Sequence, residues 1–242
     1  MSCIIKSYAK RTIRQLGFEL RRYRPASSST AQFMAMLSTH GVNLVFDVGA
    51  NTGQFGQSLR EADYLGRIVS FEPLSIARDQ LLQASRKDAL WEIAPRAAIG
   101  SENGEIEIHV AGNSVSSSIL DMLDTHVSAA PESRYVGSER VSLQRLDSLA
   151  PDYLRPDSVP FLKIDTQGYE DRVLQGATGV LDQIVGLQLE LSLVPLYEGQ
   201  RLFYEMVDQL KAKGFEVWAI WPAFTDPKSG RSLQVDVTFF RC

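Results

Sequence analysis

Short apolar runs alternate with amphipathic stretches of helical length along most of this chain. The runs at residues 43–48 (NLVFDV), 67–73 (RIVSFEP) and 90–100 (LWEIAPRAAIG) are separated by stretches with helical spacing at 53–66 and 75–87. This alternation predicts βαβ units, and therefore a mainly parallel sheet with right-handed crossovers and helices on both faces. The fold class that follows is α/β.

The same alternation resumes in the second half of the chain. Its predicted strands and helices are, in order, strand 159–165, helix 169–181, strand 184–193, helix 201–214 and the closing strands 215–221 and 233–242. A length of 242 residues suits one well-buried core and is short for two.

The alternation is interrupted over about residues 101–145. Ile106, Ile108 and Val110 alternate after an Asn-Gly pair, which predicts one arm of a hairpin. Residues 111–137 are polar and rich in serine, as in a lid, a binding loop or a disordered segment. We therefore expect a domain over residues 31–242 with an inserted hairpin and lid.

Residues 1–30 differ from the rest and are predicted to form a basic helical segment with a Pro- and Ser-rich linker. Residues 1–24 hold seven basic side chains and one acidic residue, with apolar residues at roughly helical spacing. Three interpretations are open: a solvated helix that packs on the body of the protein, an amphipathic segment that contacts an anionic membrane or an anionic substrate, or a fraying terminus.

Composition narrows the class of protein. The 44% hydrophobic and 22% charged residues are ordinary for a globular domain. A net charge of −4 gives no general attraction to nucleic acid. Two cysteines, Cys3 and Cys242, make no disulfide framework and suit a reducing cytosol. With neither a long apolar run nor a secretory signal, the chain is predicted to be cytoplasmic, with membrane association through residues 1–24 as the alternative.

Four acidic residues are predicted at the carboxyl ends of buried strands: Asp47, Glu72, Asp165 and Glu190. Ligands of doubly wound sheets bind outside this edge. A buried strand end tolerates a carboxylate only when water, a ligand or a backbone donor receives it. The four acids therefore predict a binding site.

The first of these acids precedes the turn Gly49-Ala50-Asn51-Thr52-Gly53. Gly49 and Gly53 allow a sharp turn and a close approach to a ligand, and the next helix points free N–H groups at the same place. The middle glycine of the dinucleotide pattern G-x-G-x-x-G is missing, which argues against a pyrophosphate. An acid at the first strand suits an amine, and Glu72 at the second strand suits the hydroxyls of a ribose. S-adenosylmethionine carries both groups.

The motifs FDVGANTGQFG, VSFEP, AIGSENGEIEI, SSS, VSLQRLDSL and FLKIDTQGYEDRVLQGA together resemble the FkbM family of S-adenosylmethionine-dependent methyltransferases, over about residues 42–191. The resemblance implies a Rossmann-like class I methyltransferase fold, with a seven-stranded, mostly parallel sheet whose last strand is antiparallel. It also implies O-methylation of a hydroxyl, often on a sugar, a polyketide or another secondary metabolite.

The resemblance also implies roles for single residues. Asp47, Gly49 and Asn51 would line the methionine part of the cofactor, and Glu72 would hold the ribose. Pro73 and Ala98 would lie beside the adenine, and Asp165 beside the transferred methyl group. One position departs from the family: where KIDVEG is common, this chain has KIDTQG, with Gln167 in place of an acid.

A general base would assist methyl transfer to an alcohol, because the oxygen is a poor nucleophile until its proton leaves. We predict Asp165 as the first candidate, Glu190 as the second and His126, in the serine-rich segment, as the third. Each has a structural alternative, such as capping a helix or satisfying loop backbone. Lys163 is expected to form an ion pair, and no metal site is predicted.

The predicted function is therefore an O-methyltransferase that acts on a saccharide, a glycolipid or a related small molecule. An NAD-dependent oxidoreductase on a related sheet is the first alternative. A non-catalytic nucleoside-binding domain is the second.

Overall fold

The computed structural model describes residues 11, 13–18 and 22–241. The chain divides into two compact units between His40 and Gly41. In the first unit, helix α2 (Ser29–Thr39) begins after Ser28, whose hydroxyl accepts a hydrogen bond from the backbone N–H of Ala31. Much of the basic segment 1–24 lies outside the described residues, so its membrane contact and the domain boundary near residue 30 stay predictions.

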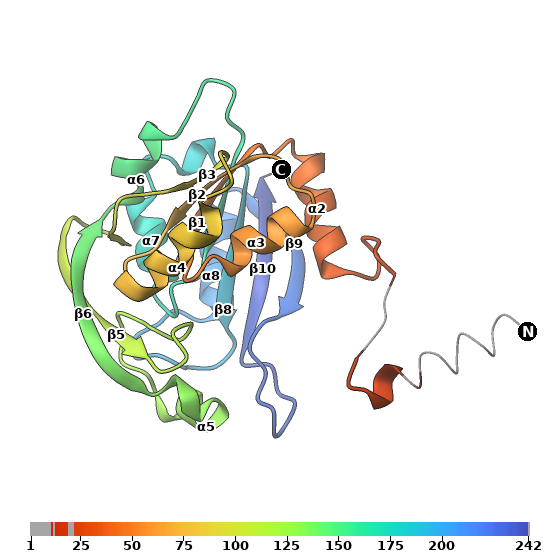
Figure 1. Cartoon of the computed structure of the whole chain (residues 1–242), viewed down its shortest axis with the longest axis vertical. Helices are drawn as coiled ribbons and strands as arrows, with labels where there is room; N and C mark the ends of the chain where they lie inside the picture. Colours follow the sequence, from red (N-terminus) through yellow and green to blue (C-terminus); the bar gives the residue numbers. More distant parts are fainter. Residues whose placement is uncertain (1–10, 12, 19–21, 242) are drawn as a thin grey trace, which may run out of the picture. The chain divides into compact units, whose positions relative to one another are not determined.

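A seven-stranded sheet forms the centre of the second unit, within residues 41–241 (Figure 1). Its strand order is β3-β2-β1-β7-β8-β10-β9. The last strand of the chain, β10, runs antiparallel to both of its neighbours, and the other neighbouring strands of this sheet pair in parallel. The predicted seven-stranded, mostly parallel sheet with an antiparallel last strand is confirmed. The strands are β1 (Leu44–Val48), β2 (Arg67–Phe71), β3 (Trp91–Ile93), β7 (Pro160–Ile164), β8 (Gly186–Ser192), β9 (Phe215–Pro222) and β10 (Gln234–Arg241).

Helices cover the sheet because the central strands are apolar on both faces. Every residue of β1 is buried, as expected of a strand between two helical layers. Helices α3 and α4 lie in front of the sheet in Figure 1, and side chains of α7 and α8 join the main apolar core. These four helices are α3 (Gln54–Glu61), α4 (Ser75–Ser85), α7 (Glu170–Gly176) and α8 (Phe203–Ala212).

The amphipathic pattern predicted for residues 201–214 is confirmed in α8. The helix buries Met206, Val207 and Leu210, and the chain leaves it through Gly214, whose φ is +84°. Glycine adopts this left-handed conformation without a steric penalty, so it is the usual residue just after a helix.

A second sheet of three strands, in the order β4-β6-β5, is formed by two strands of the predicted insertion and by β4, which directly precedes it. Strand 90–100 was predicted as one piece, and it is instead two: β3 joins the large sheet and β4 (Ala98–Ile99) joins the small one. Pro95 lies between them and has no N–H for the ladder, so the first strand stops there.

The hairpin also differs from the expectation. Strand β5 (Gly104–Ala111) pairs antiparallel with β6 (Tyr135–Gln144) rather than with the strand before the Asn-Gly pair. Residues 112–134 connect the two strands and include helix α5 (Asp124–Ala129). After β6 the chain turns into the short helix α6 (Leu146–Leu149).

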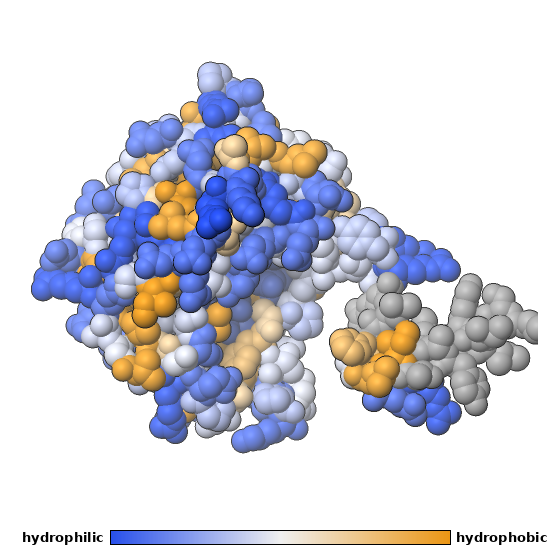
Figure 2. Space-filling model, in the orientation of Figure 1, coloured by the Kyte–Doolittle hydropathy of each residue, from blue (hydrophilic) through white to orange (hydrophobic). Residues whose placement is uncertain are grey.

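The surface facing the viewer is mostly hydrophilic, with separate apolar patches (Figure 2). Exposed large apolar side chains of the second unit include Ile76, Val115, Val136 and Trp218. In the part of the chain that the structure describes, no helix has the length and apolar character that crossing a bilayer requires.

Candidate active site

A cavity of about 320 Å³ lies at the carboxyl ends of the central parallel strands. Residues that follow β1, β2 and β7 line it, together with the serine-rich connection between β5 and β6. This is the edge where α/β sheets bind ligands, because the loops after parallel strands meet there. The volume lies at the lower end of the range for small-molecule sites, roughly 300–1,000 Å³.

The turn after β1 forms one wall of the cavity. The backbone N–H groups of Gly49 and Ala50 both donate to the carbonyl oxygen of Phe71, each at 3.1 Å. Gly49 has a φ of +77°, and a Cβ there would lie 1.9 Å from the carbonyl oxygen of Asp165. Glycine is therefore required both by backbone conformation and by close packing against the end of β7.

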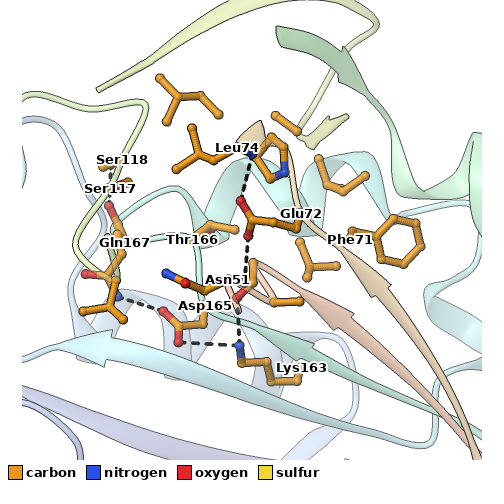
Figure 3. A pocket seen from close by; sticks show the side chains of 18 of the residues that line it. Asn51, Phe71, Glu72, Leu74, Ser117, Ser118, Lys163, Asp165, Thr166 and Gln167 are labelled. Atoms are coloured by element: carbon orange, nitrogen blue, oxygen red, sulfur yellow. Dashed lines mark hydrogen bonds and ion pairs between the residues drawn. The ribbon is translucent and has the colours of Figure 1, made fainter. Parts of the chain in front are cut away.

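Glu72 forms a second wall and is bound at both oxygens (Figure 3). Its Oε2 accepts the backbone N–H of Asn51 at 2.7 Å, and its Oε1 accepts that of Leu74 at 2.8 Å. Burial raises the pKa of this carboxyl to about 7. Each oxygen keeps a further lone pair, so the carboxylate can accept two more donors from the cavity.

Lys163 lies between two of the predicted acids. Its Nζ is 3.2 Å from Asp47 Oδ1 and 3.5 Å from Asp165 Oδ2, and it donates to the carbonyl oxygen of Gly49. Burial by itself lowers the pKa of Lys163, but the charges of Asp47 and Asp165 outweigh this and raise it above its ordinary value. The ion pair predicted for Lys163 is confirmed.

Asp47 itself is fully buried behind the cavity lining. Its Oδ2 accepts the Ser70 hydroxyl at 3.2 Å, and Ser70 in turn accepts the indole N–H of Trp91 at 3.0 Å. The chain of contacts runs from β1 through β2 to Trp91 at the start of β3, so it ties the three strands together.

Gln167 connects the acids after β7 and in β8 (Figure 3 shows its bond to Asp165). Its Nε2 donates to Asp165 Oδ1 at 2.8 Å and to Glu190 Oε2 at 2.7 Å, and its Oε1 accepts the Tyr197 hydroxyl at 2.7 Å. The backbone carbonyl of Gln167 accepts the Ser118 hydroxyl at 2.7 Å. The residue that departs from the family pattern thus joins β7, β8 and the serine-rich segment.

Three acids in or behind the cavity lining, Asp236, Glu170 and Glu190, have raised pKa values. Burial and the neighbouring charge of Asp165 raise the pKa of Asp236 to about 6, and burial raises that of Glu170 to about 7. Burial, together with Asp165, Asp236 and Glu170, raises the pKa of Glu190 well above its ordinary value. Like charges in a buried site favour protonation of some members.

The serine-rich segment closes the cavity on a further side. Ser114, Val115, Ser117, Ser118 and Ile119 all line it. The side chains of Ser114 and Asn51 lie 3.4 Å apart, which links the segment to the turn after β1. Among the three roles left open for residues 111–137, the structure supports a binding loop.

Six of the eight residues predicted to bind the cofactor line the cavity: Gly49, Asn51, Glu72, Pro73, Ala98 and Asp165. The other two, Asp47 and Gly53, lie behind it. Gly53 begins α3 with a φ of +92°, and a Cβ there would meet Leu81 at 2.9 Å and Trp91 at 3.1 Å. Gly53 supports the walls by close packing, and Asp47 supports them through its ion pair with Lys163.

The three candidates for a general base are placed differently. The Asp165 side chain is 34% exposed and lines the cavity, whereas Glu190 is connected to it through Gln167. His126 is buried against the rings of Tyr197 and Phe224, at centroid distances of 5.2 and 5.1 Å, and is not among the cavity-lining residues. Burial lowers the pKa of His126 to about 4.

Sequence reasoning missed several polar residues of the cavity, among them Gln188 and Asp236 on neighbouring strands. Gln188 is buried, and its Oε1 has no hydrogen-bond partner among the described residues. Period-two alternation within LQLEL and LQVDVTFF puts these side chains on the face opposite the core leucines and valines. A polar residue at such a position is a usable signal, because a face covered by packed helices would be apolar.

The cavity suits S-adenosylmethionine chemically. Glu72 offers paired acceptors for a diol, Phe71, Leu74 and Ile99 give apolar walls for an aromatic base, and Asp165 offers an acceptor for a cationic end. Among the described residues, no three of the His, Cys, Asp and Glu side chains are arranged to hold a metal ion.

Comparison with known proteins agrees with this chemistry. A family model described as the methyltransferase FkbM domain matches residues 47–217. A sequence comparison with curated proteins returned no match.

Solved structures with a similar fold include magnesium protoporphyrin IX methyltransferase from Synechocystis PCC 6803 with bound S-adenosylmethionine. It is 11% identical, with 88% of this chain and 78% of that chain covered and a TM-score of 0.47. An S-adenosylmethionine-dependent methyltransferase from Mesorhizobium loti is 10% identical, with coverages of 90% and 100% and a TM-score of 0.47. TehB from Haemophilus influenzae is 8% identical with a TM-score of 0.46; 87% of this chain is covered, but only 62% of TehB, less than two thirds of its length.

Proposed function

This chain belongs to the FkbM family of methyltransferase domains and uses S-adenosylmethionine, and we propose that it transfers the methyl group to a hydroxyl of a sugar, a glycolipid or a related secondary metabolite. The NAD-dependent alternative is set aside, because the family match covers residues 47–217 and includes the whole turn after β1.

One observation carries the proposal: a single cavity joins a buried carboxylate bound by two backbone amides to a partly exposed carboxylate. Glu72 is 5% exposed, and the Asp165 side chain is 34% exposed. Glu72 is the acceptor we assign to the ribose, with Pro73 and Ala98 beside the adenine. Gly49 and Asn51 then border the methionine part, and Asp165 faces the reacting end.

Asp165 can accept the proton of an alcohol as the methyl group arrives. Bound S-adenosylmethionine supplies an activated methyl group. The protein therefore has to align the acceptor oxygen and remove its proton, and a general base typically contributes roughly 10²–10⁴-fold. Glu190 is the second candidate for this base. His126, the third, packs away from the cavity, so we assign the proton transfer to the two carboxyls.

The lining of the cavity supports a polyhydroxylated acceptor with an apolar portion. Ser114, Ser117 and Ser118 add hydroxyl oxygens to the lining; those of Ser117 and Ser118 already donate to backbone carbonyls and each accept one backbone N–H, so each keeps one lone pair for a donor of the substrate. Val115 lines the cavity and is 49% exposed, so it offers an apolar contact at the rim.

The test is incubation with radiolabelled S-adenosylmethionine and a panel of deoxysugar glycolipids and their aglycones. We expect label in at least one member of the panel, and loss of most of that label in Asp165→Asn. Calorimetric titration should show binding of S-adenosylmethionine. Binding without transfer to any hydroxyl compound would instead support a non-catalytic nucleoside-binding domain.

A further inference from the structure

The cavity extends past the part that we assign to the cofactor. The cofactor groups are assigned to Glu72 after β2, Gly49 after β1 and Asp165 after β7, and these strands are neighbours in the sheet. The next two strands in the order, β8 and β10, contribute Gln188 and Asp236 to the cavity lining. These two residues therefore lie on the side of β7 that faces away from the ribose end.

A row of polar side chains crosses the sheet at the level of Gln188. Neighbouring strands pair these residues in register, in the order Ser70, Asp47, Lys163, Gln188 and Thr238. The first three satisfy one another, because the Ser70 hydroxyl donates to Asp47 and Lys163 pairs with Asp47. Gln188 Oε1 and Thr238 Oγ1 are buried without a hydrogen-bond partner among the described residues. The row is thus satisfied on β2, β1 and β7 and unsatisfied on β8 and β10.

Gln188 presents one end of its amide to the cavity. The residue is only 8% exposed, and it lines the cavity. Its Oε1 is fully enclosed by protein, so Nε2 is the polar atom left to face the cavity. Burying an amide without its hydrogen bonds costs free energy, so a buried amide of this kind is expected to meet a ligand or an ordered water.

Asp236 places an acceptor beside this amide. It lies opposite Glu190 on the neighbouring strand and is half-buried. Oε2 of Glu190 accepts the amides of Gln167 and Gln234, and Glu190 does not line the cavity. Asp236, in contrast, lines the cavity and takes part in no hydrogen bond or ion pair within the described part of the chain. On this side of the cavity, Asp236 is therefore the carboxylate with acceptor positions left for a ligand.

An aromatic ring borders the same part of the cavity. Phe55, near the start of α3, lines the cavity, and its ring centroid is 5.5 Å from Lys163 Nζ. Lys163 is also the in-register neighbour of Gln188 on β7. Small-molecule sites combine apolar and aromatic walls with a few polar groups that fix orientation, and these residues supply both.

A hydroxyl group matches this pair of polar side chains better than a cation does. A carboxylate only accepts hydrogen bonds, and the NH₂ end of an amide only donates them. A hydroxyl can donate to Asp236 and accept from Gln188 Nε2 at the same time. An ammonium group could only donate, so the amide would stay unpaired.

We propose that Gln188 and Asp236 bind a second hydroxyl of the acceptor, so that the protein selects a ring with one hydroxyl at Asp165 and another at this pair. Phe55 would then lie against the carbon face of the ring. Two strand spacings separate the backbones of Asp165 and Asp236, roughly 10 Å, which a six-membered ring held between the two side chains can fill. That the first hydroxyl receives the methyl group rests on the proposed function, whereas binding of the second hydroxyl does not.

Saturation-transfer NMR tests this pair on the full chain loaded with S-adenosylhomocysteine, the demethylated form of the cofactor. The probes are cyclohexanol, the three positional isomers of cyclohexanediol and the corresponding aminocyclohexanols, which share one ring and differ in the second group. The pH is 8, above the pKa of about 6 of Asp236. At least one diol should bind about tenfold or more tightly than cyclohexanol and than the aminocyclohexanol of the same spacing.

Gln188→Leu and Asp236→Ala should each reduce this preference to about threefold or less, with the affinity for S-adenosylhomocysteine unchanged. Gln80→Leu and Asp79→Ala, the same changes on the exposed face of α4, should keep the preference. Thermal unfolding shows whether each variant is folded. If a variant does not fold, the comparison of diol with cyclohexanol on the wild type decides.

Equal affinity of the wild type for cyclohexanol and every diol would overturn the proposal. Tighter binding of the amino compounds would do so as well, as would a diol preference that persists in both variants. A loss of S-adenosylhomocysteine affinity in both variants would move the pair to the cofactor site and also overturn it. If the diol preference depends on the pair but no hydroxyl compound is methylated, the second-hydroxyl site stands and the proposed function fails. Methylation of sugars at wild-type rates in both variants would leave the proposed function and remove this site.

Discussion

Glu72 shows how one side chain serves both the fold and the site. Its two oxygens hold the backbone N–H groups of Asn51 and Leu74, so it joins the turn after β1 to the turn after β2. The same carboxylate lines the cavity. Removing it leaves two N–H groups without their acceptor and removes the proposed partner of the ribose.

Glu72→Ala should weaken the binding of S-adenosylmethionine roughly ten- to hundredfold, because hydrogen bonds to a charged acceptor contribute about 1.5–3 kcal/mol. Glu72→Gln should lose less, since its amide oxygen still accepts. Calorimetric titration measures both, and thermal unfolding shows that each variant is folded. Wild-type affinity in a folded Glu72→Ala protein would remove Glu72 from the binding site.

The raised pKa of Glu72 predicts a pH dependence of binding. With a pKa of about 7 in the free protein, Glu72 must lose its proton to accept two hydroxyls, so affinity should fall as pH drops below about 7. Well below pH 7, the affinity should fall about tenfold for each pH unit. Titrations between pH 8 and pH 5.5 should show this slope in the wild type and a flatter one in Glu72→Ala; equal slopes would assign the titration to another group.

The pH dependence of folding stability has the opposite sign to that of ligand binding. The pKa of Glu72 is raised from 4.5, so burying the neutral acid contributes stability that is fully present below about pH 4.5 and is lost as pH rises through about 7. Bound ligand reverses part of this loss, because it favours the ionised form that the free fold disfavours.

At the level of elements, the turn between β1 and α3 depends on contact with β7. Gly49 has a positive φ and lies against the backbone of Asp165, whereas Gly104 at the start of β5 has open space around it. The two glycines therefore make a matched pair for the same substitution.

Gly49→Ala should lower the free energy of unfolding by about 2–5 kcal/mol, from the left-handed backbone penalty and from overpacking against the Asp165 carbonyl. Gly104→Ala should stay within about 0.5 kcal/mol of the wild type. Urea denaturation compares the two. A small effect at Gly49 would mean that β1 and β7 separate easily at this edge.

The small sheet has a structural role in the site. The antiparallel pair β5–β6 carries residues 112–134, and the first part of that connection reaches the cavity with Ser114, Ser117 and Ser118. Tyr135 at the start of β6 donates its hydroxyl to the carbonyl of Leu120 and stacks on His109 of β5, at 4.8 Å between ring centroids. The connection is therefore anchored at both ends.

For the molecule as a whole, charge differs between the two units. The described basic residues before the linker include Arg11, Arg14, Arg22 and Arg24, while Leu16, Phe18 and Tyr23 are exposed. Basic and apolar side chains on one segment are typical of contact with anionic lipid surfaces.

Changing Arg11, Arg14, Arg22 and Arg24 to Gln should reduce co-sedimentation with phosphatidylserine vesicles by about tenfold or more, because each basic residue near such a surface contributes up to about 1 kcal/mol. Affinity for S-adenosylmethionine should not change. Vesicles of phosphatidylcholine alone are the control. Equal sedimentation of wild type and variant would favour the interpretation of a solvated helix.

The sequence by itself determined the order of strands and helices, the Gly49 turn and the acids at the strand ends, because apolar periodicity and turn chemistry are local. It also led to the methyltransferase family. It did not separate β3 from β4, since both are short apolar pieces and strand pairing depends on partners far along the chain.

The tertiary structure decided which polar residues share the cavity. Asp47 and Glu190 follow the same pattern as Glu72 and Asp165, yet only the last two line it. Gln167 is an absent acid in the sequence and a bridge between two acids in the fold. Such roles depend on distances between side chains from different strands, and these distances are set only when the whole sheet packs.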